Sequence, residues 1–308
     1  MELARVNPHP GGIVAFQSVF LYRLFLALPS EEIHILLTRI CMELTKEYLL
    51  DALPTLVFGQ KLFVFEEIDS TNSCTRTLAD VGADEGTLVV AEHQTEGRGR
   101  LGRSWTAEPR SNLLFSLLLR PPLSQDQAGI LPFYAAVAIA RAVEPLVDQR
   151  VECKWPNDLL LNGKKFCGIL LETAIQEGRL AHAILGVGLN VNQRAFPESL
   201  AATATSLARE RNRGYDRRKL LHSILAEMEV LYTDVRTRTP DTILSEWLSR
   251  CAMIGKEVAV QTGDAIVRGR ALAVRETGAL VLETTDGQEA FFAADVSLSS
   301  APGHPERS

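Results

Sequence analysis

Apolar runs of strand length alternate with one longer run of helical spacing along the middle of the chain. Residues 62–68, 87–91 and 113–119 are rich in aliphatic and β-branched side chains, and we predict a strand in each. Residues 131–147 are rich in alanine, with apolar positions at helical spacing, which predicts a core-facing helix of about four turns. The pattern therefore indicates a fold that combines strands and helices.

A turn signal, Asn162-Gly163, stands between two further apolar runs and predicts a β-hairpin. Successive side chains of a strand point to opposite faces, so Lys164 and Lys165, which follow the turn, lie on opposite faces. At most one of these lysines can therefore point into a functional site, and the pattern leaves open which one.

Two glycines, Gly186 and Gly188, recur at period two within a strand predicted at residues 180–192. We expect them to leave a trough without side chains on one face, where a flat ring can lie. A β-bulge or tight sheet packing explains the pair equally well. Asn190 ends the trough and could hydrogen-bond a base edge.

The two ends of the chain differ from its middle. Short β-like pieces separated by glycines after residue 254 predict a small barrel that packs on the main domain. Residues 13–28 are apolar but broken by Gln17 and Arg23, and they are too short for a membrane span. We expect a docking helix there, or a stretch upstream of a true start at Met42, whose sequence Met-Glu-Leu repeats that of Met1.

Composition restricts the class of protein. The 308 residues are 46% hydrophobic and 23% charged, which suits a soluble globular chain of one large or two unequal domains. Five cysteines, an odd number without a Cys-x-x-Cys pair, argue against a disulfide framework or a zinc site. We therefore expect a reducing compartment.

The loop formed by residues 97–105 concentrates glycine and arginine in a chain of net charge -6. Its glycines let backbone amides approach a bound group, and Arg98, Arg100 and Arg103 supply planar cationic donors. This local cationic patch on an acidic protein suggests a small anionic ligand and not a nucleic-acid polymer. An RNA-binding arginine-glycine tail is disfavoured because the stretch stops at Trp105 without low-complexity repeats.

Polar groups follow several of the predicted strands. Asp69-Ser70-Thr71-Asn72 is typical of a helix start, with Asp69 or Ser70 capping a helix to about Val81, and a cap alone would explain it. Gln94 stands where a strand meets the glycine-arginine loop, a suitable place for an amide that binds a polar ring. Asn157 and Asp158, after Pro156, could hold a magnesium-bound phosphate or an incoming amine, although Pro-Asn-Asp is also a good turn.

Taken in order, these motifs resemble the signature of biotin protein ligases, the biotin–[acetyl-CoA-carboxylase] ligases. The resemblance covers residues 44–298. It implies an α+β catalytic domain at 44–252, similar to class II aminoacyl-tRNA synthetases, and an SH3-like β-barrel at 253–301, after an extension at 1–43. The implied reaction joins biotin to ATP as biotinyl-5′-AMP with Mg²⁺, and then transfers biotin to a lysine of a carrier domain.

The resemblance also implies residue roles. Catalytic roles fall to Arg100, Arg103, Asp158 and Lys165, with Lys165 chosen over Lys164 and Asp158 a ligand of magnesium or a group that orients the acceptor amine. Biotin contacts fall to Ser70, Thr71, Asn72, Gln94, Gly97, Arg98, Arg100, Trp105, Lys165, Gly186 and Gly188. ATP contacts fall to Arg98, Arg100, Arg103, Trp105, Asn157, Asp158, Lys165 and Asn190.

The expected partner is a biotin carboxyl carrier protein or domain, in the cytoplasm, with the ligase a monomer or homodimer. Some members of the family also repress genes through a winged helix, but residues 1–43 lack a recognition helix with outward polar side chains, so we expect no DNA binding and no membrane association. Two alternatives remain: a lipoate–protein ligase of the same superfamily, and a non-catalytic binder of biotin or nucleotide.

Overall fold

The computed structural model describes residues 43–237, 241–262, 265–292 and 295–298. One compact unit begins at Leu44. The expectations for the amino-terminal extension, including a start at Met42 and the lack of DNA binding, fall almost entirely outside the described residues.

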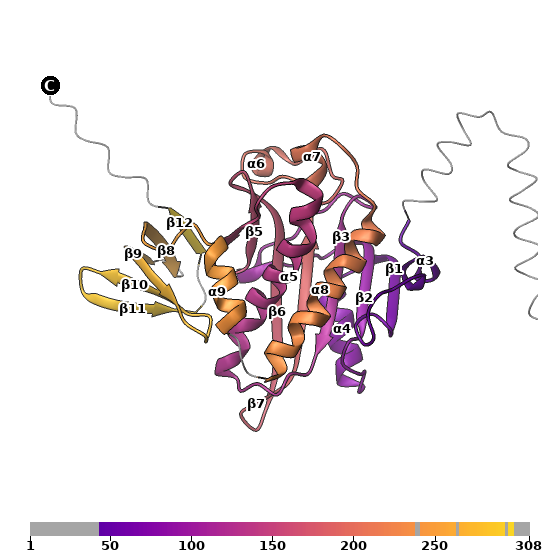
Figure 1. The fold of residues 1–308 in the computed structure, drawn as a ribbon, viewed down its shortest axis with the longest axis horizontal. Coiled ribbons are helices and arrows are strands. Elements are labelled where there is room, and N and C mark those ends of the chain that lie inside the picture. Colours follow the sequence, from indigo (N-terminus) through magenta and orange to yellow (C-terminus); the bar gives the residue numbers. More distant parts are fainter. Residues whose placement is uncertain (1–42, 238–240, 263–264, 293–294, 299–308) are drawn as a thin grey trace, which may run out of the picture. The chain divides into compact units, whose positions relative to one another are not determined.

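A mixed sheet of seven strands forms the centre of the larger domain (Figure 1). Its order is β1 (Leu62–Ile68), β2 (Leu88–Gln94), β3 (Leu113–Leu119), β7 (Arg179–Leu189), β6 (Lys164–Gln176), β5 (Asp158–Leu161) and β4 (Glu152–Lys154). Only the β1–β2 pairing is parallel within this sheet. The strands predicted at 62–68 and 113–119 are confirmed, and so is the hairpin turn, where Asn162 and Gly163 have φ values of 50° and 72°.

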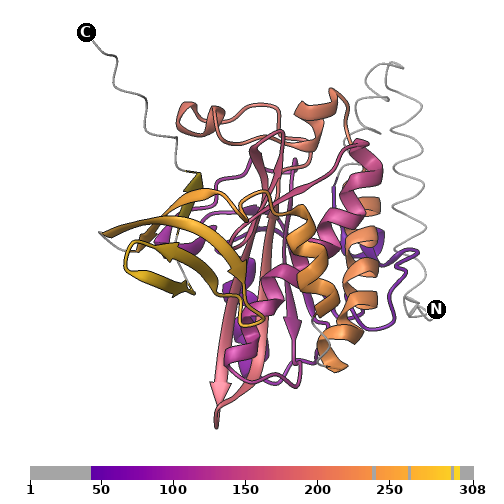
Figure 2. The same cartoon turned by 60° about the vertical axis from the view of Figure 1, so that its left-hand side comes forward.

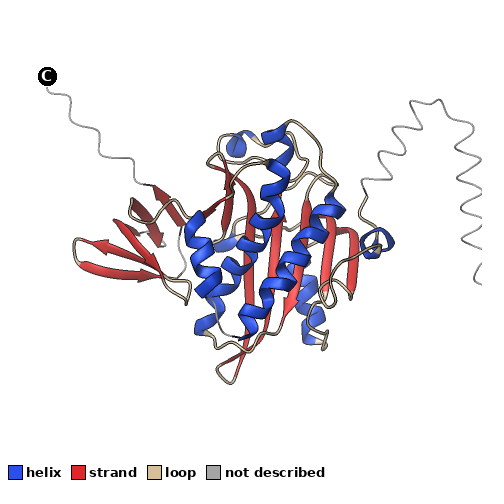
Figure 3. Cartoon of the chain, viewed as in Figure 1, coloured by secondary structure: helices blue, strands red, loops and turns tan. Residues whose placement is uncertain are grey.

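Helices cover the sheet in an arrangement visible in Figures 2 and 3. The long helices are α5 (Leu131–Val147), α8 (Arg217–Thr237) and α9 (Asp241–Arg250), with α4 (Thr71–Asp80) packed against β2, β3 and β7. The shorter helices are α3 (Lys46–Leu50), α6 (Glu198–Ala201), α7 (Leu207–Arg211), η1 (Arg100–Gly102) and η2 (Asp126–Ile130). The helix predicted at 131–147 is therefore confirmed.

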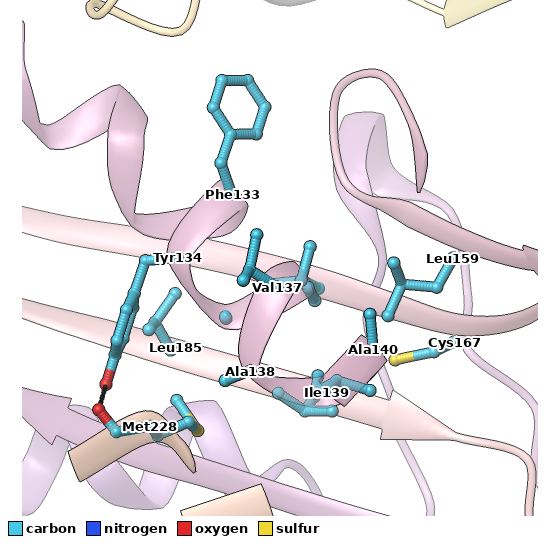
Figure 4. Packing of buried hydrophobic residues seen from close by; sticks show 14 of the residues in the cluster. Phe133, Tyr134, Val137, Ala138, Ile139, Ala140, Leu159, Cys167, Leu185 and Met228 are labelled. Atoms are coloured by element: carbon cyan, nitrogen blue, oxygen red, sulfur yellow. Dashed lines mark hydrogen bonds between the residues drawn. The ribbon is translucent and has the colours of Figure 1, made fainter. Parts of the chain in front are cut away.

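Strand alternation divides the apolar residues between two faces of the sheet. Phe115 and Leu117 of β3 belong to the large core around α5, where the Tyr134 hydroxyl donates to the Met228 carbonyl at 2.6 Å (Figure 4). Leu118 packs instead with Ala79 of α4 on the other face. Residues 126–147 are long and apolar enough to cross a membrane, but 72% of this window is buried inside the fold, so core packing accounts for its composition.

The helix expected after Asp69 begins as predicted, with Ser70 at the N-cap, but its side-chain capping was predicted wrongly. Ser70 makes no capping hydrogen bond, and Asp69 accepts a hydrogen bond from the Ser70 amide at 2.6 Å. The Thr71 amide, the first of the helix, donates to Gln94 of the neighbouring strand at 2.8 Å. The first turn is thus held by the sheet.

The carboxyl-terminal domain is an antiparallel sheet of five strands. Its order is β11 (Gly287–Phe291), β10 (Leu280–Thr284), β9 (Ala265–Val274), β8 (Glu257–Thr262) and β12 (Asp295–Leu298). The Trp155 indole donates to the Gly278 carbonyl at 2.9 Å, and a Cβ on Gly129 would lie 1.9 Å from the Thr277 carbonyl oxygen. The turn between β9 and β10 therefore packs directly on the larger domain, as expected for so small a module.

Candidate active site

A pocket lies on the α4 face of the central sheet, between the start of α4, strands β6 and β7, and the loop 97–105. It is lined by Ser70, Thr71, Asn72, Gln94, Arg98, Trp105, Gly168, Leu170, Gly186, Val187 and Gly188. Most of the residues expected to contact biotin therefore meet here, although they come from four separate segments of the sequence. Gly97 adjoins them, since a Cβ on it would lie 3.2 Å from the Gln94 amide nitrogen.

The trough expected over Gly186 and Gly188 exists, but it is not free of side chains. A Cβ on Gly186 would lie 2.1 Å from Oδ1 of Asn72, and one on Gly188 would lie 2.3 Å from Cε2 of Trp105. The glycines thus let α4 and the loop 97–105 approach the strand closely. The free space in the pocket is small, about 30 Å³, with the Trp105 indole lying over Gly188.

A chain of hydrogen bonds forms the polar wall of the pocket. The amide and the hydroxyl of Thr71 both donate to Oε1 of Gln94, at 2.8 and 2.9 Å. A backbone amide can only donate, so the carbonyl end of Gln94 faces Thr71 and its NH₂ group points the other way. The buried Nδ2 of Asn72 has no partner among the described residues. The wall therefore offers the pocket N–H donors that a ligand's carbonyl oxygen could accept.

The pairing of β5 with β6 decides which lysine faces the pocket. The register shifts between Leu159 and Leu160, so that Leu159 pairs with Cys167 while Leu160 pairs with Lys165. This bulge inserts Phe166 as an extra residue, and both Phe166 and Cys167 lie in the core. Lys165 consequently points toward the pocket, and Lys164 lies on the opposite face.

Lys165 lies within a group of charged side chains at the edge of the pocket. Its Nζ is 2.7 Å from Oδ1 of Asp158 and 5.3 Å from the centre of the Trp105 ring. Burial lowers the pKa of the Arg100 guanidinium, the negative charge of Asp158 opposes that shift, and the positive charge of Arg103 adds to it. Cations are therefore concentrated beside a single carboxylate, which suits an anionic reactant.

Arg98, which also lines the pocket, is held by side chains of α4 and β6. Its guanidinium donates to Oγ of Ser73 at 2.9 Å and lies 3.5 Å from a carboxylate oxygen of Glu172, which also pairs with Arg76. Glu172 was not among the residues predicted from the sequence to form the site. Within the loop, Trp105 donates its amide to the Gly97 carbonyl at 2.8 Å, so the loop closes on itself.

The other expected nucleotide contacts lie outside the pocket. Arg103, Asn157 and Asp158 line a neighbouring cavity of about 290 Å³ together with Lys154 and residues of the carboxyl-terminal sheet. Asn190 lines neither cavity; it is buried and donates to the Thr205 carbonyl at 3.1 Å. Among the described residues no group of three His, Cys, Asp or Glu side chains could hold a metal ion.

Family profiles, sequence relatives and a solved structure all relate this chain to biotin protein ligases. Residues 64–190 match the profile of the biotin/lipoate A/B protein ligase family, and residues 253–299 match the biotin protein ligase C terminal domain. The chain is 38% identical over 248 residues to the bifunctional ligase/repressor BirA of Bacillus subtilis, covering 80% of this chain and 76% of that protein. It is 35% identical over 243 residues to the biotin–[acetyl-CoA-carboxylase] ligase of Mycobacterium tuberculosis, covering 77% and 88%.

A solved structure agrees with these relatives. The biotin protein ligase of Aquifex aeolicus in complex with biotin and ATP superposes with a TM-score of 0.67 at 28% sequence identity. The superposition covers 78% of this chain and 100% of the Aquifex chain. The fold class expected from the sequence is confirmed by this similarity.

Proposed function

The chain belongs to the biotin protein ligase family, and we propose that it activates biotin with ATP and transfers it to a lysine of a carrier domain. The family and the ligase activity expected from the motifs are thereby confirmed, whereas the residue roles below are our proposal. The observation that carries the proposed function is the pocket itself, in which α4, the loop 97–105 and the glycines of β7 meet beside Lys165.

The polar wall supports biotin as the ligand of the pocket. Biotin's ureido ring carries a carbonyl oxygen, which suits the donors of Gln94 and Asn72. The dithiolane ring of lipoate has no such acceptor and would leave these donors unpaired. We therefore prefer biotin to lipoate, and propose that Trp105 moves off Gly188 to cover the bound ring and the adenylate.

The charged group supports the adenylation step. A carboxylate oxygen of biotin would attack the α-phosphorus of ATP while the bond to the leaving pyrophosphate breaks. Negative charge builds on the phosphate oxygens in this step, and fixed cations stabilise that charge. The positive charge for this stabilisation would come from Lys165, Arg100 and Arg103. Asp158 pairs with Lys165 at 2.7 Å and would orient its ammonium group. Mg²⁺ would be held mainly by the phosphates of ATP, with Asp158 as its protein ligand. Magnesium sites commonly use one or two carboxylates plus substrate phosphates. The bound ion would neutralise part of the phosphate charge.

The second step would use the neighbouring cavity. This cavity opens between Asp158 and the carboxyl-terminal sheet and could admit a lysine side chain of the carrier. Asp158 would then orient the incoming amine. The described cysteines are free, in agreement with a reducing compartment, for which we propose the cytoplasm.

Labelling of a carrier domain tests this function. Purified ligase, ATP, Mg²⁺ and biotin should convert an isolated biotin carboxyl carrier domain into a streptavidin-reactive product, and omission of ATP should abolish the signal. Replacing biotin by lipoate should give no product detectable with an anti-lipoyl antibody. Lipoylation would identify a lipoate ligase, and biotin binding without any labelling would leave only a non-catalytic binder.

Arg100→Gly should weaken retention of biotinyl-5′-AMP. Arg100 is half-buried between the loop and Asp158, so its loss removes a cation next to the phosphate and loosens the loop. We expect the intermediate to dissociate about tenfold faster or more, measured after rapid filtration. Arg110→Gly is a matched control, because Arg110 pairs with Glu66 on the surface and already has a positive φ of 61°. An unchanged release rate in Arg100→Gly would refute the role assigned to the loop.

A further inference from the structure

Ser116 is a polar residue in the middle of an otherwise apolar strand. Strand β3 has the sequence Leu-Leu-Phe-Ser-Leu-Leu-Leu, and Ser116 is 0% exposed. It pairs with Val89 of β2 on one side and with Gly186 of β7 on the other, directly beneath the start of α4. Burial of a hydroxyl costs free energy unless it is hydrogen-bonded, so its partners show what the position is for.

The partners of Ser116 are the residues of the polar wall. Its Oγ lies 2.7 Å from Oγ1 of Thr71 and 2.5 Å from Oδ1 of Asn72. The proton of the Thr71 hydroxyl goes to Gln94, so the single Ser116 proton is the donor available to the Asn72 carbonyl oxygen and the Thr71 oxygen. Ser116 does not itself line the pocket.

In the structure the Asn72 amide is turned so that Oδ1 accepts from the Ser116 hydroxyl, and this direction holds while the Ser116 proton goes to Asn72 and not to Thr71. With Oδ1 held by Ser116, the Asn72 NH₂ group is left as a donor, and it is buried without a partner among the described residues. If the Ser116 hydroxyl were absent, nothing would favour Oδ1 over Nδ2 at that place, because both ends of an amide have nearly the same shape. The polarity of the wall therefore depends on one hydroxyl behind it.

We propose that Ser116 is a positioning residue that sets the specificity of the pocket for a ring carrying a carbonyl oxygen. By fixing Asn72 and Thr71, its hydroxyl keeps the wall composed of donors, so that a ring with a donor in place of the carbonyl is rejected. This inference rests on the proposed biotin-binding function. It adds to the residues that determine specificity one that does not touch the ligand.

Three ligands of related shape test the proposal. Biotin has a ureido carbonyl, which is an acceptor. In 2-iminobiotin a guanidinium, protonated at neutral pH, takes its place and is a donor. Desthiobiotin keeps the carbonyl but lacks the sulfur. Dissociation constants for all three are measured by calorimetry with wild type, Ser116→Ala and Ser116→Cys. The cysteine variant preserves the volume of the buried side chain with a much weaker donor, so it covers the case in which alanine impairs folding.

We expect the preference for biotin over 2-iminobiotin to fall about tenfold in both variants, since a buried donor matched to a ligand acceptor controls discrimination of this size. The preference for biotin over desthiobiotin should stay constant, because both carry the carbonyl. Leu118→Val, on the same face of β3 but within an apolar cluster, is the matched control and should change neither ratio.

Two results would overturn the proposal. If Ser116→Ala and Ser116→Cys weakened all three ligands equally, Ser116 would have a structural role only. If both ratios matched those of the wild type, the wall would be oriented by other groups. Failure of the wild type to bind biotin or desthiobiotin would instead contradict the proposed function, so the two failures are distinguishable.

Discussion

Lys165→Met is expected to lower the rate of biotin-dependent ATP–pyrophosphate exchange by about 10² to 10³-fold. The Lys165 ammonium is 2.7 Å from Asp158 at the edge of the pocket, 5.3 Å from the centre of the Trp105 ring and 3.1 Å from where a Cβ on Gly168 would lie. Methionine keeps the length and packing of the side chain and removes only its charge and its donors. The loss should therefore appear in kcat, because the charge matters most where negative charge develops on the phosphate.

Lys164→Met is the matched control for this experiment. The two lysines are adjacent in sequence, but the bulge at Phe166 turns Lys164 to the other face of the strand. Its exchange rate should lie within about twofold of the wild type, since the half-buried Lys164 side chain faces away from the pocket and its charge has little effect there. A large loss in Lys164→Met with none in Lys165→Met would show that the bulge is placed wrongly.

Arg217→Met is expected to destabilise the catalytic domain by about 3–5 kcal/mol, the cost of leaving a buried charge without its partner. Arg217 and Glu92 form an ion pair in which the side chains are only 2% and 6% exposed. The same guanidinium donates to the Asn112 carbonyl at 3.0 Å, and Glu92 accepts from the Leu44 amide at 2.7 Å. Urea unfolding followed by circular dichroism measures the loss.

Lys61→Met supplies the comparison for a surface ion pair. Lys61 and Asp84 are 60% and 67% exposed, so the free energy of unfolding should change by less than about 1 kcal/mol. Glu92→Gln introduced into Arg217→Met should recover part of the stability, because it neutralises the stranded carboxylate. If Arg217→Met and Lys61→Met unfolded at the same urea concentration, the buried pair would not stabilise the fold as proposed.

Much of the fold could be predicted from the sequence because its signals are local. Continuous apolar runs, alanine-rich helical spacing and the Asn162-Gly163 turn depend on a few neighbouring residues, and the structure places each of these elements where the pattern predicted it. The membership of the pocket could also be predicted, since residues from α4, β2, β7 and the loop 97–105 line it together.

Other features could not be read from the same patterns. Ser116 gives no signal, because one serine within an apolar strand does not reveal what lies above it. The trough over Gly186 and Gly188 was expected to lack side chains, and the error arose because the glycines admit Asn72 and Trp105 from elements distant in sequence. Side-chain capping by Ser70 was also predicted wrongly: its hydroxyl makes no capping hydrogen bond, and the first helical amide is bonded to Gln94 of a strand distant in sequence.

The two adjacent lysines separate the contributions of sequence and tertiary structure most clearly. Alternation along a strand is a local property, so the sequence by itself determined that Lys164 and Lys165 point to opposite faces. Which of them faces the pocket depends on the register between β6 and β5, and there a bulge inserts Phe166 and reverses the expected alternation. The resemblance to biotin ligases selected Lys165, but the strand pattern could not, and only the tertiary structure gives the physical reason: the bulge follows from packing Phe166 and Cys167 into the core between two strands and not from either strand alone.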